Sequence, residues 1–96
     1  MRKIELNFNI PHTRSQIHEY LKEKLEFPDY YGNNLDALYD CLTDICEPTA
    51  IGLYFSYSDY DEEDHDLASY FDKVKKVFRD AEEDNKALAV FVFERY

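Results

Sequence analysis

Three segments with strand-like hydrophobic patterns alternate with helical segments, and this order constrains the fold more than any other feature. Residues 3–9, KIELNFN, alternate between apolar and polar side chains, as in a strand with one buried face. Residues 50–57, AIGLYFSY, are apolar at almost every position. Residues 87–93, ALAVFVF, form a continuous apolar run, which is typical of a strand that is central or buried on both faces. Strands joined by helical crossovers pair in parallel with right-handed connections.

The segments between these strands have apolar residues at helical spacing and predict three helices. The first follows a cap at Thr13, the second is capped by Asn33 or Asn34, and the third spans about residues 66–83 and ends near Asn85. We therefore predict an α/β fold of order β-α-α-β-α-β, a small single domain over residues 1–96 with a three-stranded parallel sheet and helices packed on it. The core-facing residues of the second helix are predicted to be Leu35, Leu38, Tyr39, Leu42 and Ile45 or Cys46.

The chain is strongly acidic, with 21 acidic and 11 basic residues and a formal net charge of -10. A surface of this sign has no basic stripe to displace phosphate counterions, so we predict no nucleic-acid partner. Basic proteins are the favoured partners because opposite fields steer association, and simple solubility is the alternative explanation. MRKIELNFNI has no apolar core of a signal peptide, and no apolar run approaches about 20 residues. We therefore expect a cytoplasmic protein without a membrane segment.

The second predicted helix has three aspartates on one face. Asp36, Asp40 and Asp44 are spaced by four residues, so they lie about one turn apart. Like charges at this spacing destabilise a helix by a few tenths of a kcal/mol each, and Asp44 also lies unfavourably near the C-terminal end of the helix dipole. No Lys or Arg occurs from residue 25 to residue 72. Such repeated exceptions to local stability rules indicate a functional site.

Tyrosines accompany this acidic face, and two interpretations follow. Tyr30 and Tyr31 precede the helix, and Tyr39 neighbours Asp40. Rigid aromatic anchors beside orienting charges are typical of a protein interface, which here would fit a cleft lined by cations. The alternative is a solvated acidic face with the tyrosine rings packed into the core. The residues alone do not decide between them.

Other candidates for chemistry are weak, and we predict no enzyme activity, no cofactor and no metal site. His12, His18 and His65 are scattered and are expected at the surface. Cys41 and Cys46 are expected to be reduced, mostly buried thiols rather than a disulfide. The acidic loop at 58–66 lacks the central glycine and the ligand spacing of a calcium loop.

The segment FPDYYGNNLDALYDCLTDI, residues 27–45, resembles the characteristic segment of the barstar family, intracellular inhibitors of the bacterial ribonuclease barnase. The resemblance is strongest over residues 27–43, where polar residues are also in register. VFRDA, residues 77–81, is similar to Val-Phe-Arg-Glu-Ala on the family's last long helix. The length and the order of elements agree as well, so the resemblance extends loosely over the chain.

The resemblance implies an inhibitory face and a secondary contact, with Asp40 entering the phosphate-binding site of a ribonuclease. The mechanism it implies is occlusion of that site rather than catalysis. The implied partner is a basic secreted ribonuclease or a toxin nuclease domain, bound one to one by a chain that is a monomer when free. The residues of the implied face are Tyr30, Asn34 at its edge, Leu35, Asp36, Tyr39 and Asp40, and those of the secondary contact are Val77 and Asp80.

The chain departs from the family pattern near this face. Tyr39 and Ile45 each stand where the family has Trp, Asp44 replaces Gly, and Asp80 is one methylene shorter than the family's Glu. The added charge of Asp44 suits a more basic partner, and these changes leave the specific enzyme open. The alternative function is an immunity protein or a binding module for another basic toxin or protein that is not a ribonuclease.

Overall fold

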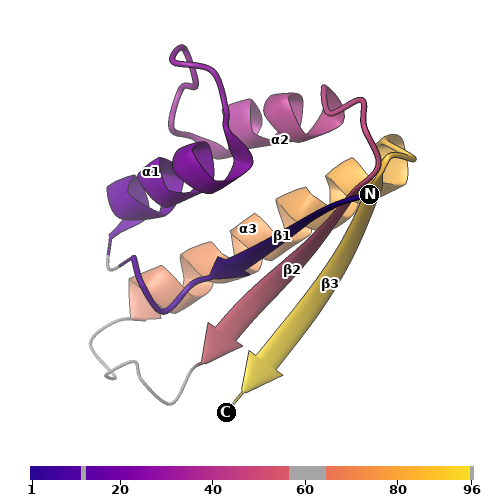
Figure 1. The fold of residues 1–96 in the computed structure, drawn as a ribbon. Helices are drawn as coiled ribbons and strands as arrows, with labels where there is room; N and C mark the ends of the chain where they lie inside the picture. The colour runs from indigo at the N-terminus through magenta and orange to yellow at the C-terminus, as the bar shows by residue number, and fades with distance from the viewer. Residues whose placement is uncertain (12, 57–64, 96) are drawn as a thin grey trace.

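A three-stranded parallel sheet, in the order β1-β2-β3, organises the computed structural model, which describes residues 1–11, 13–56 and 65–95 (Figure 1). The predicted α/β class and the order β-α-α-β-α-β are confirmed. The acidic loop, apart from the backbone at residues 65 and 66, lies outside the described residues. The elements are β1 (Arg2–Asn7), α1 (Arg14–Leu25), α2 (Leu35–Thr43), β2 (Thr49–Ser56), α3 (His65–Asp84) and β3 (Leu88–Arg95).

The helices cover one face of the sheet because both crossovers run in the same direction. Right-handed connections from β1 to β2 and from β2 to β3 place their helices on a common face. Figure 1 shows α3 behind the sheet. In this view α3 lies between β3 on one side and α1 and α2 on the other. Leu6 and Leu53, which are register partners on this face, are fully buried. The largest fully buried side chains include Phe8, Phe71, Phe78, Ile17, Leu21, Leu38 and Leu42.

The prediction that residues 87–93 form a central or doubly buried strand is wrong. β3 is an edge strand, paired only with β2 among the described residues, and β2 is the central strand. Phe91 is 53% exposed and Phe93 50% exposed on the face without helices. The Phe93 ring stacks on Tyr54 with centroids 4.8 Å apart, so these aromatic rings shield each other where no helix covers them.

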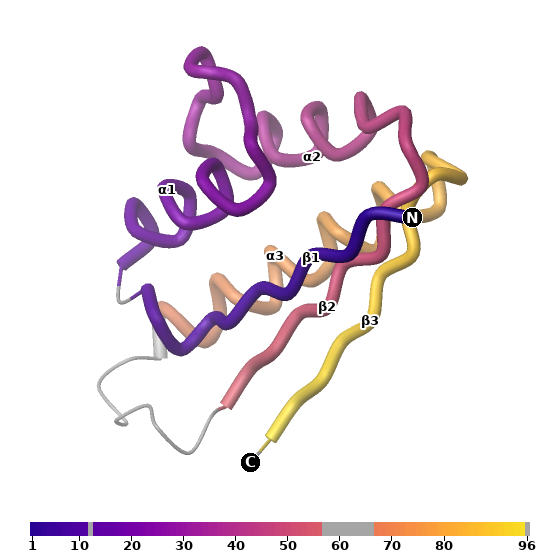
Figure 2. Tube along the Cα trace, viewed as in Figure 1, coloured from indigo at the N-terminus to yellow at the C-terminus, as the bar shows by residue number. Residues whose placement is uncertain are grey.

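Residues at both ends of α1 fix where this helix begins and ends. Thr13 Oγ1 accepts a hydrogen bond from the Gln16 N–H at 3.1 Å, as predicted for the first cap. α1 ends at Leu25, and its C-cap residue Glu26 has the left-handed conformation at φ 56°. Figure 2 shows the following loop extending away from the sheet before the chain enters α2. Within the described ranges no helix is both long and apolar enough to cross a membrane.

His18 was expected at the surface, and this expectation is wrong because α1 turns the side chain into the core. It is only 1% exposed. Its Nδ1 lies 2.6 Å from the Tyr31 hydroxyl and its Nε2 lies 2.5 Å from the Tyr70 hydroxyl. Both ring nitrogens therefore have partners, which joins α1 to the loop before α2 and to α3. His12 and the side chain of His65 lie outside the described residues.

Burial of His18 predicts a pH-dependent stability. Burial lowers the pKa of His18, and the Arg14 guanidinium lies 4.7 Å from the ring of Tyr70 that His18 contacts. The unfolded chain therefore binds a proton near pH 6.5 more readily than the folded chain does, so stability is full above that pH and decreases below it. One such group contributes at most about 1.4 kcal/mol per pH unit.

Urea unfolding between pH 5.5 and 7.5 measures this effect, with His18→Gln as the comparison. The wild-type free energy of unfolding should fall with decreasing pH more steeply than that of His18→Gln, which does not titrate here. Parallel pH profiles for the two proteins would contradict the assignment of this slope to His18.

Candidate protein-binding surface

The loop before α2 and the Asn34 cap set the start of the acidic helix. Asn34 Oδ1 accepts a hydrogen bond from the Ala37 N–H at 2.8 Å, and Asn34 Nδ2 donates to the Gly32 carbonyl at 3.2 Å. Of the two asparagines that the sequence offered as caps, Asn34 is therefore the one used. Asn33 instead has the left-handed conformation at φ 52°, which asparagine tolerates better than most residues.

The two aspartates of this helix and the one at its C-cap point to solvent. Asp36, Asp40 and Asp44 are exposed, whereas Leu38 and Leu42 on the opposite side are fully buried. Within residues 1–11, 13–56 and 65–95, none of the three carboxylates forms an ion pair with a Lys or Arg of the chain. The acidic face is therefore presented outward on a helix that is anchored by its apolar side.

A groove of about 510 Å³ lies between the 25–32 segment and α2. It brings together Tyr30, Asp40 and Asp44, three of the residues that the sequence proposed as contacts. Tyr30 is 86% exposed, whereas the adjacent Tyr31 is buried and lines the inner part of the groove. Thus Tyr31 packs into the core, as one interpretation expected of both tyrosines, whereas Tyr30 projects outward, as the interface interpretation expected.

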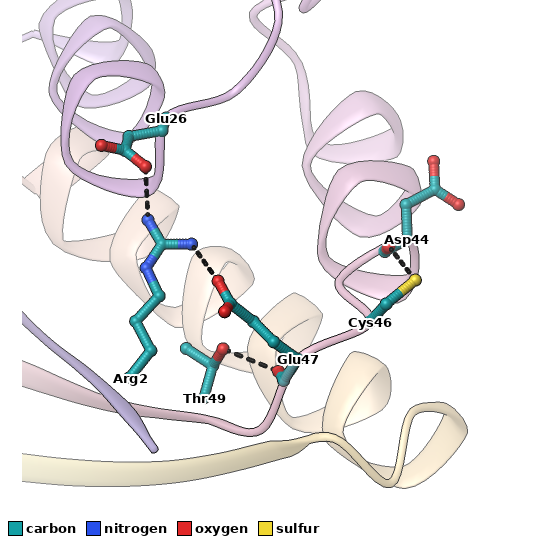
Figure 3. A network of polar contacts seen from close by, with 6 residues as sticks. All are labelled: Arg2, Glu26, Asp44, Cys46, Glu47 and Thr49. Carbon is teal, nitrogen blue, oxygen red and sulfur yellow. Dashed lines mark hydrogen bonds and ion pairs between the residues drawn. The ribbon is translucent and has the colours of Figure 1, made fainter.

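Arg2 lies in this groove and is paired with acids other than the three aspartates. Figure 3 shows its guanidinium reaching Glu26 at the end of α1 and Glu47 after α2, at 3.0 and 3.4 Å. The Asp44 carboxylate points away from Arg2, while the Asp44 carbonyl accepts a hydrogen bond from the Cys46 thiol at 3.3 Å. These contacts connect the two walls of the groove and leave the negative charge of Asp44 facing outward.

Another side of α2 faces α3, where Tyr39 lies near the proposed contacts Val77 and Asp80 of α3. The Tyr39 hydroxyl donates a hydrogen bond to the Asp84 carboxylate at the end of α3. This bond, followed by burial and the nearby charges of Asp84, Asp80 and Asp40, raises the pKa of Tyr39. Asp80 itself is partly neutralised by Lys76 at 3.1 Å. Half-buried Val77 packs against the core beside this region.

Five of the proposed contact residues form two adjoining groups. Tyr30, Asp40 and Asp44 line the groove, and Tyr39 of α2 lies near Asp80 of α3. Leu35 is half-buried and packs against the core from the first turn of α2. That these residues contact a partner stays a prediction.

Two residues at the end of α3 that touch α2 were not identified as site residues from the sequence. Asp84 accepts the hydrogen bond from Tyr39, and Asn85, expected only to end the third helix, donates to backbone carbonyls at the end of α2. Both contacts join residues that are 40 or more positions apart. No local spacing could have indicated them.

The cysteines are free thiols, but their burial differs from the expectation. Cys41 is half-buried and Cys46 is exposed. Burial and the neighbouring Asp44 and Asp40 charges raise the pKa of Cys41, which disfavours the reactive thiolate. The described part of the chain has no group of three or more His, Cys, Asp or Glu side chains arranged to hold a metal ion.

Comparison with known proteins identifies the family to which this fold belongs. Residues 1–93 match the model of the family described as Barstar (barnase inhibitor). A relative from Bacillus subtilis (strain 168), named "Putative ribonuclease inhibitor YrdF", is 40% identical over 86 residues, which cover 90% of this chain and 91% of the relative. The three-stranded parallel α/β fold, together with sequence matches that cover about nine tenths of the chain or more, places the protein in the class of ribonuclease-inhibitor-like proteins. The chain belongs to the barstar family.

Proposed function

We propose that this protein inhibits a basic ribonuclease by inserting the carboxylates of α2 into the enzyme's phosphate-binding site. The observation that supports this most directly is the outward position of Asp36 and Asp40, without cationic partners in the described chain, on a helix of a barstar-family protein. An unneutralised pair on a rigid helix matches the charge of a site built to bind RNA phosphates. The protein itself would have no catalytic activity.

In this mechanism Asp40 occupies the position of a substrate phosphate. Asp36 and Tyr30 contact neighbouring cationic and ring-bearing groups of the enzyme, and Val77 with Asp80 adds a secondary contact. Because the aspartates are mounted on a packed helix, little conformational entropy is lost on docking. Removing one carboxylate would leave enzyme cations buried without a partner, which is strongly unfavourable.

The groove extends this surface beyond Asp40. Asp44 lies on the same outward face and also lines the groove. A partner with an additional cation next to its phosphate site would match this charge. We therefore propose a secreted enzyme or toxin nuclease domain that is more basic at this position, bound one to one by a monomeric inhibitor in the cytoplasm of the producing cell.

Capture of the cognate partner tests the function. The tagged chain is incubated with cell and culture extracts of the source strain, and the retained protein is assayed for RNA cleavage with and without added inhibitor. We expect a basic protein whose RNA cleavage stops at one equivalent of the chain. Barnase, which the family description names, is the first defined probe in the same assay.

A partner that cleaves no RNA, or that remains active when saturated with the chain, would contradict the proposal. A basic but non-nucleolytic partner would favour the alternative of a binding module. In that case the residues near the acidic face that depart from the family pattern, Asp44 above all, would be the ones that redirect partner choice.

A further inference from the structure

The C-terminal end of α2 is electrostatically unfavourable as an isolated helix end. The last turn contains no basic residue, and the C-cap is Asp44. The final carbonyl groups of a helix have no partner within the helix, and they form the negative end of its dipole. An additional carboxylate at this end opposes helix formation. Some other group must therefore hold this end in place.

The side chain of Asn85, at the C-terminal end of α3, supplies that group. Its amide nitrogen Nδ2 lies 3.0 Å from the Leu42 carbonyl oxygen, 2.8 Å from that of Ile45 and 3.3 Å from that of Thr43. An amide nitrogen has two hydrogens, so the longest of the three contacts shares one of them. One neutral side chain thus satisfies carbonyls that a Lys or Arg would otherwise bind.

Asn85 is itself fixed by the backbone around it. Its N–H donates to the Ala81 carbonyl at 2.8 Å, and its Oδ1 accepts from the Ala87 N–H at 3.0 Å. Its carbonyl accepts from the Leu88 N–H at 3.1 Å, at the start of β3. The adjacent Asp84 accepts the hydrogen bond from Tyr39. Two consecutive residues, the last of α3 and the first of the α3–β3 connection, therefore hold α2 at two points.

We infer that Asn85 is a positioning residue for the acidic face of α2. The carbonyls that it binds belong to the turn and cap that include Asp44, and the Asp44 N–H in turn donates to the Asp40 carbonyl at 3.1 Å. Losing the amide donor would release this end of the helix and spread the orientations of the Asp40 and Asp44 carboxylates. The importance of this for binding rests on the proposed function.

Asn85→Asp is the sharpest test because it replaces the amide donor with a carboxylate oxygen and keeps the size of the side chain. The carboxylate retains an oxygen for the Ala87 N–H but faces the three carbonyls with negative charge. Asn7→Asp is the matched control: Asn7 is exposed at the end of β1, and its Oδ1 accepts from the Asn9 N–H at 3.0 Å, which aspartate preserves. Both variants add one negative charge, but only Asn85→Asp removes a hydrogen-bond donor to the end of α2.

Amide hydrogen exchange reads out the contact without any nuclease. In Asn85→Asp the amides of Asp44 and Ile45 should exchange about tenfold faster than in the wild type, while those in the middle of α1, such as Leu21, remain unchanged. Asn7→Asp should leave both regions unchanged. Unaltered exchange at Asp44 and Ile45, or equal acceleration throughout the chain, would overturn the inference.

Affinity for barnase provides the second readout. Added negative charge alone strengthens attraction to a basic enzyme, so a purely electrostatic effect would make both variants bind at least as tightly as the wild type. We expect Asn85→Asp to bind about tenfold more weakly than Asn7→Asp instead. Equal affinities for the two variants would overturn the positioning role. A wild-type chain that does not inhibit barnase counts against that enzyme as partner, and the exchange result then decides the role of Asn85 by itself.

Discussion

Asp40→Ala should weaken inhibition of the cognate ribonuclease by at least about thirtyfold, which corresponds to about 2 kcal/mol of binding free energy. Asp40 is exposed, lies in the middle of the acidic face and also lines the groove beside Tyr30. The substitution removes the carboxylate proposed to replace a substrate phosphate, while alanine favours the helix itself. An inhibition titration with RNA as substrate measures the change in apparent Kd.

Glu23→Ala is the control for this experiment. Glu23 is exposed on α1, so its removal changes the net charge by the same amount away from the acidic face. We expect a change of less than about threefold because contacts outside the centre of an interface contribute little. If both variants weaken inhibition equally, general charge attraction is responsible and the specific role of Asp40 is wrong.

Leu38→Ala should lower the free energy of unfolding by about 2–5 kcal/mol, the range seen when a buried leucine is truncated. Leu38 is fully buried on the side of α2 opposite the aspartates, within the core that also includes Leu42 and Phe71. The lost methyl groups leave a cavity in the contact that holds the acidic helix to the domain. The urea midpoint measured at neutral pH should fall, with little change in the denaturant slope.

Lys76→Ala provides the comparison for stability. Lys76 is 74% exposed on α3 and pairs with Asp80 across one helical turn. Exposed pairs of this kind contribute little, so the free energy of unfolding should change by less than about 1 kcal/mol. A loss for Leu38→Ala as small as that for Lys76→Ala would show that α2 is not anchored by its buried face.

Features set by local spacing were predictable from the sequence. Alternation or continuous apolar runs identified the strands, helical spacing identified the helices, and the four-residue spacing of Asp36, Asp40 and Asp44 placed them on one outward face. The cap at Thr13 followed from the same local chemistry. These properties depend on residues within one or two turns of each other.

Features set by distant contacts were not predictable. β3 has the apolar run of a central strand, but the strand order places it at the edge of the sheet. His18 appeared to be a surface residue because its partners, Tyr31 and Tyr70, lie 13 and 52 positions away. Asn85 bonds to carbonyls at least 40 positions away. In each case the deciding neighbour comes from another element of the folded domain.

The attachment of α2 to residues 84 and 85 has a consequence during protein synthesis. Tyr39 and the end of α2 obtain their partners only after Asp84 and Asn85 have left the ribosome, and β3 follows them. A nascent chain that has exposed α2 alone therefore presents the aspartates on an unsupported segment, because short isolated helices are marginal in water. Under the proposed function, protection against an enzyme that degrades RNA would thus depend on finishing translation of this chain before the enzyme acts on its message.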